Sequence, residues 1–284
     1  MKTILDRIVE TKRQEAAAAR RALPLETLAA EARRAHRPRD FFGAVAGPAP
    51  CGVHLIAEIK KASPSAGLIR ADFDPLTIAR LYHRAGASAI SVLTDGTYFQ
   101  GRPEHLAQVK SAVPLPVLGK DFVVDEYQIY EARRHGADAV LLIAEVLDTD
   151  TIRRYADLIG ELDMTALIEV HAASLLDELV RAIDLDPSHR RLLGINNRDL
   201  TIQRTDVGTT ARLAAGLTGK PLTGESRRAG IKGRPVLVSE SGIKTRADVE
   251  QVMAAGAAAI LVGETLLRAD DVVGKIAELL GCGR

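Results

Sequence analysis

The sequence predicts a closed (β/α)8 barrel, the TIM-barrel class, with an N-terminal helical extension. Eight short apolar runs each stop abruptly at polar or charged residues, and helix-like segments separate consecutive runs. Strands that alternate with helices pair in parallel, and eight such units favour closure into a barrel. The runs end at Glu58-Ile59-Lys60, Thr94-Asp95, Lys120-Asp121, Glu145, Glu169, Asn196-Asn197-Arg198, Glu240-Ser241-Gly242 and Gly263-Glu264.

The first run, from His54 to Lys60, has the alternation that a barrel strand requires. One face carries Ile56, Glu58 and Lys60, while the intervening positions are all apolar. The apolar face suits packing against helices, and the other face passes from core to charge. Because the carboxyl ends of barrel strands converge on one mouth, where active sites lie, we expect the charged clusters to meet in a single pocket.

A repeated helix-to-strand connection supports the βα units. Three segments share a template in which a glycine is followed by small residues and then by an apolar run. The glycine is predicted to form a left-handed cap at the end of a helix, before the second, fourth and eighth strands. The segments are 84–90, 134–140 and 255–260.

We expect a single domain over residues 1–284, with two segments added to the barrel. Residues 1–48 are the helical extension, in which Leu5 and Val9 have i, i+4 spacing, and we expect its helices to pack against the barrel near its mouth. Residues 216–235, rich in glycine and basic residues, indicate a flexible inserted loop. Joining a helix to the next strand, this loop is expected on the face opposite the pocket.

The composition favours a soluble cytoplasmic protein. The 284 residues include 38 basic and 37 acidic ones, a net charge of +1 that gives no field attracting nucleic acid or a membrane surface. The N-terminus lacks an apolar signal core, and no run approaches the roughly 20 apolar residues of a membrane span. The only cysteines, Cys51 and Cys282, form no metal-ligand pattern and favour a reducing compartment.

Three strand ends carry candidate catalytic groups, and each has an ordinary alternative. The Glu58 and Lys60 pair could be a salt bridge, Lys120 could be an ion-pair partner, and Glu169 could cap a loop amide. The predicted barrel favours the catalytic interpretation over these alternatives, because the four residues and Glu240 would then share one pocket. Mixed charge is expensive to desolvate without a purpose.

Small residues at the ends of the last two predicted strands indicate a phosphate site. Segments 239–243 and 262–265 place glycine and serine where backbone N–H groups can approach a ligand, and barrels often bind phosphate there. Tight turns that need positive φ are the alternative explanation.

Five blocks, in order along the chain, resemble the indole-3-glycerol phosphate synthase family. The resemblance extends from the leader helices to the C-terminal helix, and its main departure is segment 216–235, which family members usually make much shorter. The blocks are Glu58-Ile59-Lys60-Lys61-Ala62-Ser63-Pro64-Ser65, Leu118-Gly119-Lys120-Asp121-Phe122, Ala166-Leu167-Ile168-Glu169-Val170-His171, Gly194-Ile195-Asn196-Asn197-Arg198-Asp199-Leu200 and Ser239-Glu240-Ser241-Gly242-Ile243.

The resemblance implies a carboxy-lyase of tryptophan biosynthesis. In that reaction 1-(2-carboxyphenylamino)-1-deoxyribulose 5-phosphate closes to indole-3-glycerol phosphate with loss of CO2 and water. It implies a phosphorylated small-molecule substrate, no cofactor, no metal, and no nucleic-acid or membrane partner. It also implies a monomer that could associate loosely with other enzymes of the pathway.

By the same resemblance, the charged residues take distinct roles. Lys120 is the general acid that protonates the ketone, and burial beside the Lys60 cation is expected to lower its pKa. Lys60 suits the substrate carboxylate and the departing hydroxyl, although its share of the acid role stays open. Glu169 is the base for dehydration, Glu58 orients the lysines and the anilino nitrogen, and Asn196 holds the intermediate.

The remaining site residues are expected to bind substrate. Arg198 offers a forked donor to a carboxylate or stiffens its loop. Pro64 and Phe122 form an apolar wall for the benzene ring, and Glu240 joins the pocket. The phosphate is expected at Ser63, Ser241, Gly242, Gly263 and the backbone of Glu264.

Three alternatives remain at this stage. Phosphoribosylanthranilate isomerase, a related phosphate barrel, would want a cysteine at the end of the first strand, where this chain has Glu58 and Lys60. A Schiff-base aldolase would use a barrel lysine covalently. A catalytically silent phosphate-binding barrel could serve as a regulatory module, but the presence of both Lys60 and Lys120 with Glu58 and Glu169 argues against it.

Overall fold

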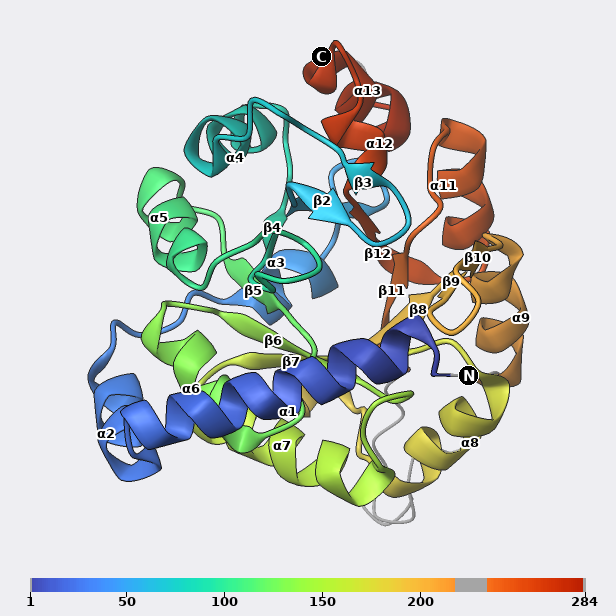
Figure 1. Cartoon of the computed structure of the whole chain (residues 1–284). Helices are drawn as coiled ribbons and strands as arrows, with labels where there is room; N and C mark the ends of the chain where they lie inside the picture. Colours follow the sequence, from blue (N-terminus) through green and yellow to red (C-terminus); the bar gives the residue numbers. More distant parts are fainter. Residues whose placement is uncertain (1, 218–233, 283–284) are drawn as a thin grey trace.

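Eight parallel strands close into a barrel in the computed structural model, which describes residues 2–217 and 234–282 (Figure 1). Each strand pairs with its neighbours, and the first strand pairs with the last to complete the circle. The predicted (β/α)8 class is therefore confirmed. The strands are β1 (His54–Ile59), β4 (Ala89–Leu93), β5 (Val117–Lys120), β6 (Ala139–Ile143), β7 (Thr165–Val170), β8 (Arg191–Asn196), β11 (Val236–Glu240) and β12 (Ala257–Val262).

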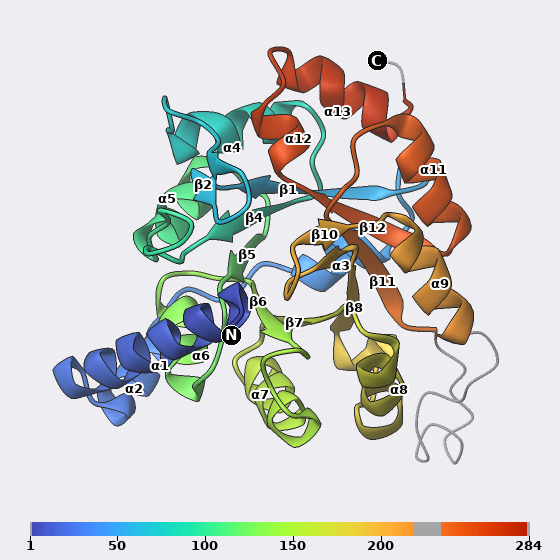
Figure 2. The same cartoon turned by 45° about the vertical axis from the view of Figure 1, so that its right-hand side comes forward.

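Helices between the strands form the outer layer (Figure 2). Most have an N-cap residue whose side chain accepts a hydrogen bond from a backbone N–H of the first turn. These N-cap residues are Asp74, Asp125, Asp148, Thr245 and Asp271. The helices are α4 (Pro75–Arg84), α5 (Glu104–Ala112), α6 (Glu126–Arg134), α7 (Thr149–Glu161), α8 (Ala173–Ala182), α9 (Gly208–Leu217), α11 (Arg246–Ala254), α12 (Glu264–Leu267) and α13 (Val272–Leu280), with a 3-10 turn, η1 (Pro187–His189), before β8.

The repeated connection predicted from the sequence is present. Gly86, Gly136 and Gly256 follow α4, α6 and α11 with φ values of 94°, 93° and 95°. An L-residue with a side chain rarely adopts this conformation, so glycine permits each helix to turn directly into the next strand. The strands that follow are β4, β6 and β12, as expected.

The N-terminal extension reaches both ends of the barrel. Helix α1 (Ile4–Ala22) begins with a capping box at Thr3 and lies across the mouth, while α2 (Leu25–Arg34) packs on α6 (Figure 1). Helix α3 (Phe41–Ala46) contacts β1, β4 and β12. Its Phe41 and Val45 are fully buried in the same cluster as the inward side chains of the strands. The extension therefore caps the mouth with one helix and fills the bottom with another.

The barrel interior is a packed core, with apolar side chains from every strand in one inner cluster. Ile56 of β1 and Leu118 of β5 are fully buried within it. Burying a side chain of this size contributes about 1.5–3 kcal/mol. A second, larger cluster fills the layer between the strands and the surrounding helices. The polar residues at the carboxyl ends of the strands therefore lie directly above a closely packed apolar core.

Most of the predicted insert, 216–235, lies outside the described residues. Helix α9 ends at Leu217, and the description resumes at Arg234, just before β11. Among the helices of 2–217 and 234–282, none is long and apolar enough to cross a membrane.

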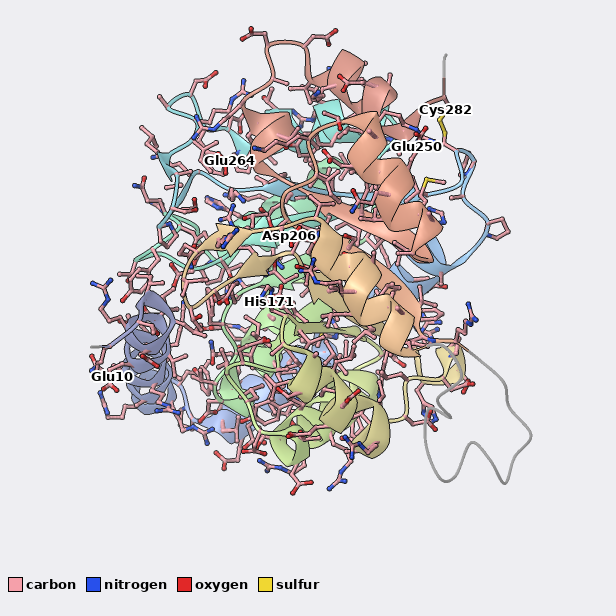
Figure 3. The ribbon with its side chains drawn as sticks, turned by 90° about the vertical axis from the view of Figure 1, so that its right-hand side faces the viewer. Glu10, His171, Asp206, Glu250, Glu264 and Cys282 are labelled. Atoms are coloured by element: carbon pink, nitrogen blue, oxygen red, sulfur yellow. A yellow bond between two sulfur atoms is a disulfide. The ribbon has the colours of Figure 1, made fainter. Side chains whose placement is uncertain are left out.

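Cys51 and Cys282 are joined by a disulfide, with their Cα atoms 5.8 Å apart. Cys51 precedes β1 and Cys282 follows α13, so the bond lies at the bottom of the barrel. Figure 3 shows Cys282 on the opposite side of the molecule from Glu264, which belongs to the mouth. The sequence did not indicate the pair because 231 residues separate the two cysteines. Such a bond persists in oxidising surroundings, so cysteine usage no longer argues for a reducing compartment.

We expect the oxidised protein to melt roughly 10 °C above the Cys282→Ser variant, with turnover unchanged. Cross-linking a loop longer than 100 residues restricts the unfolded chain and stabilises the fold by about 4–5 kcal/mol. Turnover is unaffected because the bond lies opposite the mouth. Calorimetry with and without a reductant measures the difference, and reduced parent protein is the control. Equal melting temperatures for the oxidised parent and the variant would contradict the expectation.

Candidate active site

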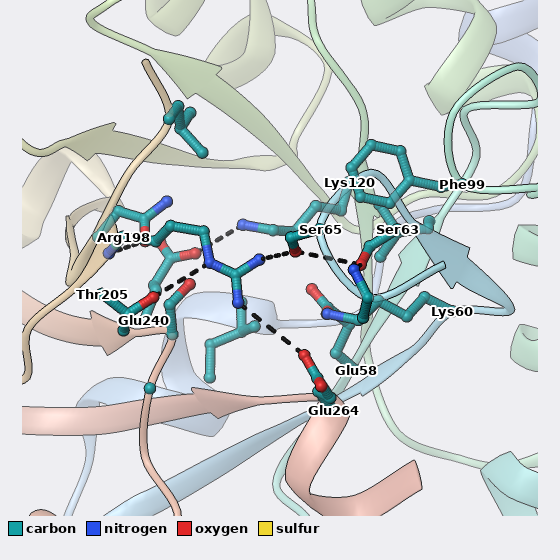
Figure 4. A pocket seen from close by; sticks show the side chains of 18 of the residues that line it. Glu58, Lys60, Ser63, Ser65, Phe99, Lys120, Arg198, Thr205, Glu240 and Glu264 are labelled. Atoms are coloured by element: carbon teal, nitrogen blue, oxygen red, sulfur yellow. Dashed lines mark hydrogen bonds and ion pairs between the residues drawn. The ribbon is translucent and has the colours of Figure 1, made fainter. Parts of the chain in front are cut away.

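A cavity of about 1100 Å³ opens at the carboxyl ends of the strands. Every residue that the sequence singled out for the site lines this one cavity (Figure 4). Six of the eight polar strand ends therefore converge on it as the barrel requires, whereas Thr94 and Asp95 after β4 and Glu145 after β6 do not line it. The residues singled out for the site are Glu58, Lys60, Ser63, Pro64, Lys120, Phe122, Glu169, Asn196, Arg198, Glu240, Ser241, Gly242, Gly263 and Glu264.

Lys120 is shared by two carboxylates from other strands. Its Nζ lies 2.6 Å from Oε2 of Glu240 and 3.0 Å from Oε2 of Glu169. Both glutamates are buried, and the amide of Asn196 donates to Oε1 of Glu169 at 2.9 Å. These side chains come from β5, β7, β8 and β11, so one polar network joins both sides of the barrel.

A second ion pair stands beside this network. Lys60 Nζ lies 2.6 Å from Oε1 of Glu58, and both side chains are largely buried. The pairing expected as the ordinary alternative is thus present. It lies inside the cavity and not on an exposed surface, so it also holds a cation and a carboxylate available to a ligand.

The expected lowering of the Lys120 pKa is wrong for this state of the protein. Burial by itself favours the neutral amine, but the carboxylates of Glu169 and Glu240 outweigh it and raise the pKa of Lys120. The sequence-based expectation considered Lys60 as the main neighbour, whereas Lys60 is paired with Glu58. Lys120 is therefore an ammonium ion at neutral pH.

The two carboxylates around Lys120 differ in their affinity for a proton. Burial raises the pKa of Glu240 to about 8, and the charge of Glu169 adds to this although Lys120 opposes it. For Glu169, burial acts against ionisation, but Lys120 and the Asn196 hydrogen bond hold its pKa below the usual value. Two nearby like charges are costly, so the site favours one carboxylate and one neutral acid.

Two glycines make room for these carboxyl groups. A Cβ at Gly194 would overlap Oε1 of Glu240, and a Cβ at Gly263 would overlap Oε1 of Glu58. Gly263 was expected to leave space for a phosphate, yet the space that a side chain at this position would fill is occupied by Glu58. The absence of a Cβ at both positions therefore sets the arrangement of the acidic groups.

The backbone turns sharply at the end of β11. Ser241 and Gly242 have φ values of 67° and 80°, so the alternative explanation, a tight turn that needs positive φ, holds at this turn. It does not hold at Gly263, where φ is -123°. A Cβ at Gly242 would lie 2.5 Å from Cγ2 of Thr205, so glycine is required by space as well as by conformation. The turn lies in the cavity wall next to Gly263, where β12 gives way to α12.

Arg198 links three loops at the mouth. Its guanidinium donates to Ser65 Oγ at 2.8 Å and to Thr205 Oγ1 at 3.3 Å, and lies 3.9 Å from a carboxylate oxygen of Glu264 (Figure 4). Two short hairpins carry Ser65 and Thr205, namely β2 (Ala62–Ser63) with β3 (Gly67–Leu68) and β9 (Arg198–Asp199) with β10 (Arg204–Thr205), while Glu264 is the first residue of α12. In this state Arg198 holds the loops together.

Several cavity residues were missed from the sequence. Leu5 and Ile8 of α1 reach the cavity; the sequence placed the helices of the extension near the mouth but did not identify these two side chains as part of the cavity wall. Phe99, in the loop after β4, also lines it, its ring centroid 6.1 Å from that of Phe122. Nothing in the sequence around Phe99 distinguishes it from an ordinary loop aromatic.

Fold and site together define a (β/α)8-barrel enzyme with acid–base groups in a closed-bottomed cavity. The family model described as indole-3-glycerol phosphate synthase matches residues 5–279. The chain is 45% identical to indole-3-glycerol phosphate synthase of Roseiflexus castenholzii, covering 99% of both chains. It is 44% identical to the enzyme of that name from Neisseria meningitidis serogroup C, covering 98% of this chain and all of the other. The protein belongs to the indole-3-glycerol phosphate synthase family.

More distant solved structures share the fold. Thiamine phosphate pyrophosphorylase from Pyrococcus furiosus matches with a TM-score of 0.52 and 14% identity, over 80% of this chain and 94% of that one. 3-Hexulose-6-phosphate synthase from Salmonella typhimurium matches with the same TM-score and identity, over 81% and 97%. At this identity the likeness concerns the barrel alone.

The raised pKa of Glu240 predicts a pH dependence of stability that Glu240→Gln removes. The folded pKa lies above the ordinary value of 4.5, so folding favours the protonated form. The stabilisation is complete below pH 4.5 and is lost as pH rises to about 8. The variant should therefore gain stability relative to the parent between pH 5 and pH 9, on the order of a few kcal/mol.

Denaturant unfolding of parent and variant across that pH range measures the effect. Glu178→Gln, at an exposed position of α8, is the matched control. A difference between Glu240→Gln and parent that stays constant with pH would mean that Glu240 is ionised throughout.

Proposed function

We propose that this protein is an indole-3-glycerol phosphate synthase of tryptophan biosynthesis. It converts 1-(2-carboxyphenylamino)-1-deoxyribulose 5-phosphate to indole-3-glycerol phosphate, with loss of CO2 and water. The observation that carries the proposal is Lys120 between Glu169 and Glu240, with the Lys60–Glu58 pair in the same cavity. Ring closure needs a proton donor and dehydration needs a base, and this cavity holds both.

Lys120 is the general acid of the proposed mechanism. Its raised pKa keeps it fully protonated, and the proton is transferred as negative charge develops on the ketone oxygen during attack by the aromatic carbon. The substrate oxygen takes the place of one of the carboxyl groups that hold the ammonium. Loss of that carboxylate contact lowers the pKa of Lys120 and makes the proton easier to give up.

Glu169 is the base of the dehydration step. Its lowered pKa keeps it ionised at neutral pH, and the Asn196 amide fixes one of its oxygens at 2.9 Å. Glu240, neutral over much of the same range, supports Lys120 without adding a full negative charge. Lys60 faces the substrate carboxylate and the departing hydroxyl, and Glu58 orients that lysine.

The rest of the cavity binds the two ends of the substrate. Pro64 and Phe122 form the apolar wall for the benzene ring, and Arg198 exchanges its loop contacts for an anionic group of the ligand. The phosphate end lies at the turns after β11 and β12. Its residues are Ser63, Ser241, Gly242, Gly263 and the backbone of Glu264.

We further propose that the chain acts as one domain, a monomer in the cytoplasm that needs no cofactor and associates at most loosely with other enzymes of the pathway. An isomerase of the same pathway is less well supported, because β1 ends with Glu58 and Lys60 and not with a cysteine. In a reducing cytoplasm, Cys51 and Cys282 would remain thiols.

Indole fluorescence tests the proposal directly. Purified protein mixed with the carboxyphenylamino sugar phosphate should release CO2 and form an indole product at equal rates. A catalytically silent barrel would bind the substrate without either change, and this outcome would refute the assigned activity.

The acid and the base should separate in single-turnover experiments. Lys120→Met removes the proton donor, so neither CO2 release nor indole formation should occur, although substrate still binds. Glu169→Gln removes the later base, so CO2 release should persist while indole formation slows. General acid–base groups contribute about 10²–10⁴-fold, and losses of that order are expected in turnover.

Lys2→Met and Glu178→Gln, at exposed positions, are the matched controls. Near-parental turnover in Lys120→Met would transfer the acid role to Lys60. Equal loss of CO2 release and indole formation in Glu169→Gln would place the base earlier in the reaction.

A further inference from the structure

Helix α1 carries a buried lysine that points toward the barrel. The Lys12 side chain is 5% exposed, whereas its neighbour Arg13 is exposed to solvent. Lys12 lies one turn beyond Ile8, on the face of α1 that covers the mouth. An ammonium ion is buried only where partners compensate for its lost hydration.

Lys12 has three such partners: two aspartates at adjacent strand ends, and Glu15 of the same helix, whose Oε2 lies 3.0 Å from Lys12 Nζ. Lys12 Nζ lies 2.8 Å from Oδ2 of Asp95, which follows β4, and 2.9 Å from Oδ1 of Asp121, which follows β5. Asp95 is fully buried, and Thr94 Oγ1 also donates to Asp121 at 2.8 Å. Without Lys12, two carboxylates would face each other in a largely dry site, and at least one would have to take up a proton or move.

Each aspartate also holds the backbone of an aromatic residue of the cavity. Oδ1 of Asp95 accepts from the N–H groups of Tyr98 at 2.6 Å and Phe99 at 3.1 Å. Oδ1 of Asp121 accepts from the N–H of Phe122 at 2.8 Å. These hydrogen bonds therefore fix the two loops from which the Phe99 and Phe122 rings enter the cavity.

The same helix completes the apolar wall. Leu5 and Ile8 line the cavity and belong to the same buried cluster as Phe122, with Phe99 packed against it. The position of α1 is fixed further along by the Tyr127 hydroxyl, which donates to the carbonyl of Ala19 at 3.1 Å. Lys12 thus joins α1 to both the β4 loop and the β5 loop, whereas the nearby pair of Thr11 Oγ1 and the Tyr98 hydroxyl, 3.0 Å apart, joins α1 to the β4 loop alone.

We propose that Lys12 is a positioning residue for the aryl end of the substrate. Its ammonium contacts both Asp95 and Asp121 and holds the two side chains close together, and these place Phe99 and Phe122 beside Leu5 and Ile8 in the cavity wall. Lys12 does not touch the reacting groups. The identity of the aryl group rests on the proposed function, while the assembly of the apolar wall rests on the contacts alone.

Lys12→Met tests this role by removing the charge while retaining an unbranched side chain. The Michaelis constant for the carboxyphenylamino sugar phosphate should rise roughly tenfold or more, the scale of a pocket contact, while the turnover number changes less. Inhibition by inorganic phosphate should be unchanged, because that ligand does not use the aryl wall. Arg13→Met, on the exposed face of α1, is the matched control.

Two further variants separate positioning from general stability. Lys12→Arg keeps the charge and should restore most of the affinity. Lys12→Met combined with Asp95→Asn and Asp121→Asn removes the unpaired charges while retaining acceptor oxygens for the loop N–H groups, so it too should recover affinity. This triple variant also carries the test if Lys12→Met alone does not fold.

Binding of 2-aminobenzoate, followed by its fluorescence, tests the wall without turnover. Binding of 2-aminobenzoate should weaken in Lys12→Met and recover in Lys12→Arg, whether or not the parent protein forms indole. A parent protein that fails to form indole would refute only the proposed function. If folded Lys12→Met had unchanged affinity for 2-aminobenzoate and for the carboxyphenylamino sugar phosphate, the proposed role of Lys12 would be overturned. A loss of turnover with an unchanged Michaelis constant would also overturn it.

Discussion

The sharing of one ammonium ion by two buried carboxyl groups constrains the rest of this site. Glu169 and Glu240 project from β7 and β11, and Lys120 reaches both from β5. Burying this many charges is tolerable only when each contact is made, so the strands must keep their registers to within a fraction of a residue. The close-packed barrel interior supplies that rigidity, and the chemistry at the mouth depends on it.

The fold was predictable because its signal repeats along the chain. Alternation in the run ending at Lys60, and the glycines at 86, 136 and 256, recur often enough to specify a closed parallel barrel. The pocket residues followed from the fold, since strand ends converge. The pKa of Lys120 did not follow, because it depends on which carboxylates approach in space, and the sequence contains no distances.

Pairings across long sequence separations were also hidden. Lys12 occupies a helix rich in charged residues, where a lysine is ordinarily solvated, and only the structure shows that two strand-end aspartates surround it. The disulfide between Cys51 and Cys282 was hidden for the same reason, because 231 residues separate the two cysteines in the sequence. The extension likewise gave a helical pattern and was expected near the mouth, where α1 lies, but nothing in it indicated that Phe41 and Val45 of α3 fill the opposite end.

Gly194 and Gly263 do no chemistry, yet the positions of Glu240 and Glu58 depend on a missing methyl group at each. A chain that keeps both acids is therefore bound to keep both glycines, and a change at either would disable the enzyme while leaving every reactive group in place. In a comparison of related sequences, such residues would be as invariant as the catalytic ones. Invariant positions around the mouth should therefore include residues that leave room for the reactive groups as well as the reactive residues themselves.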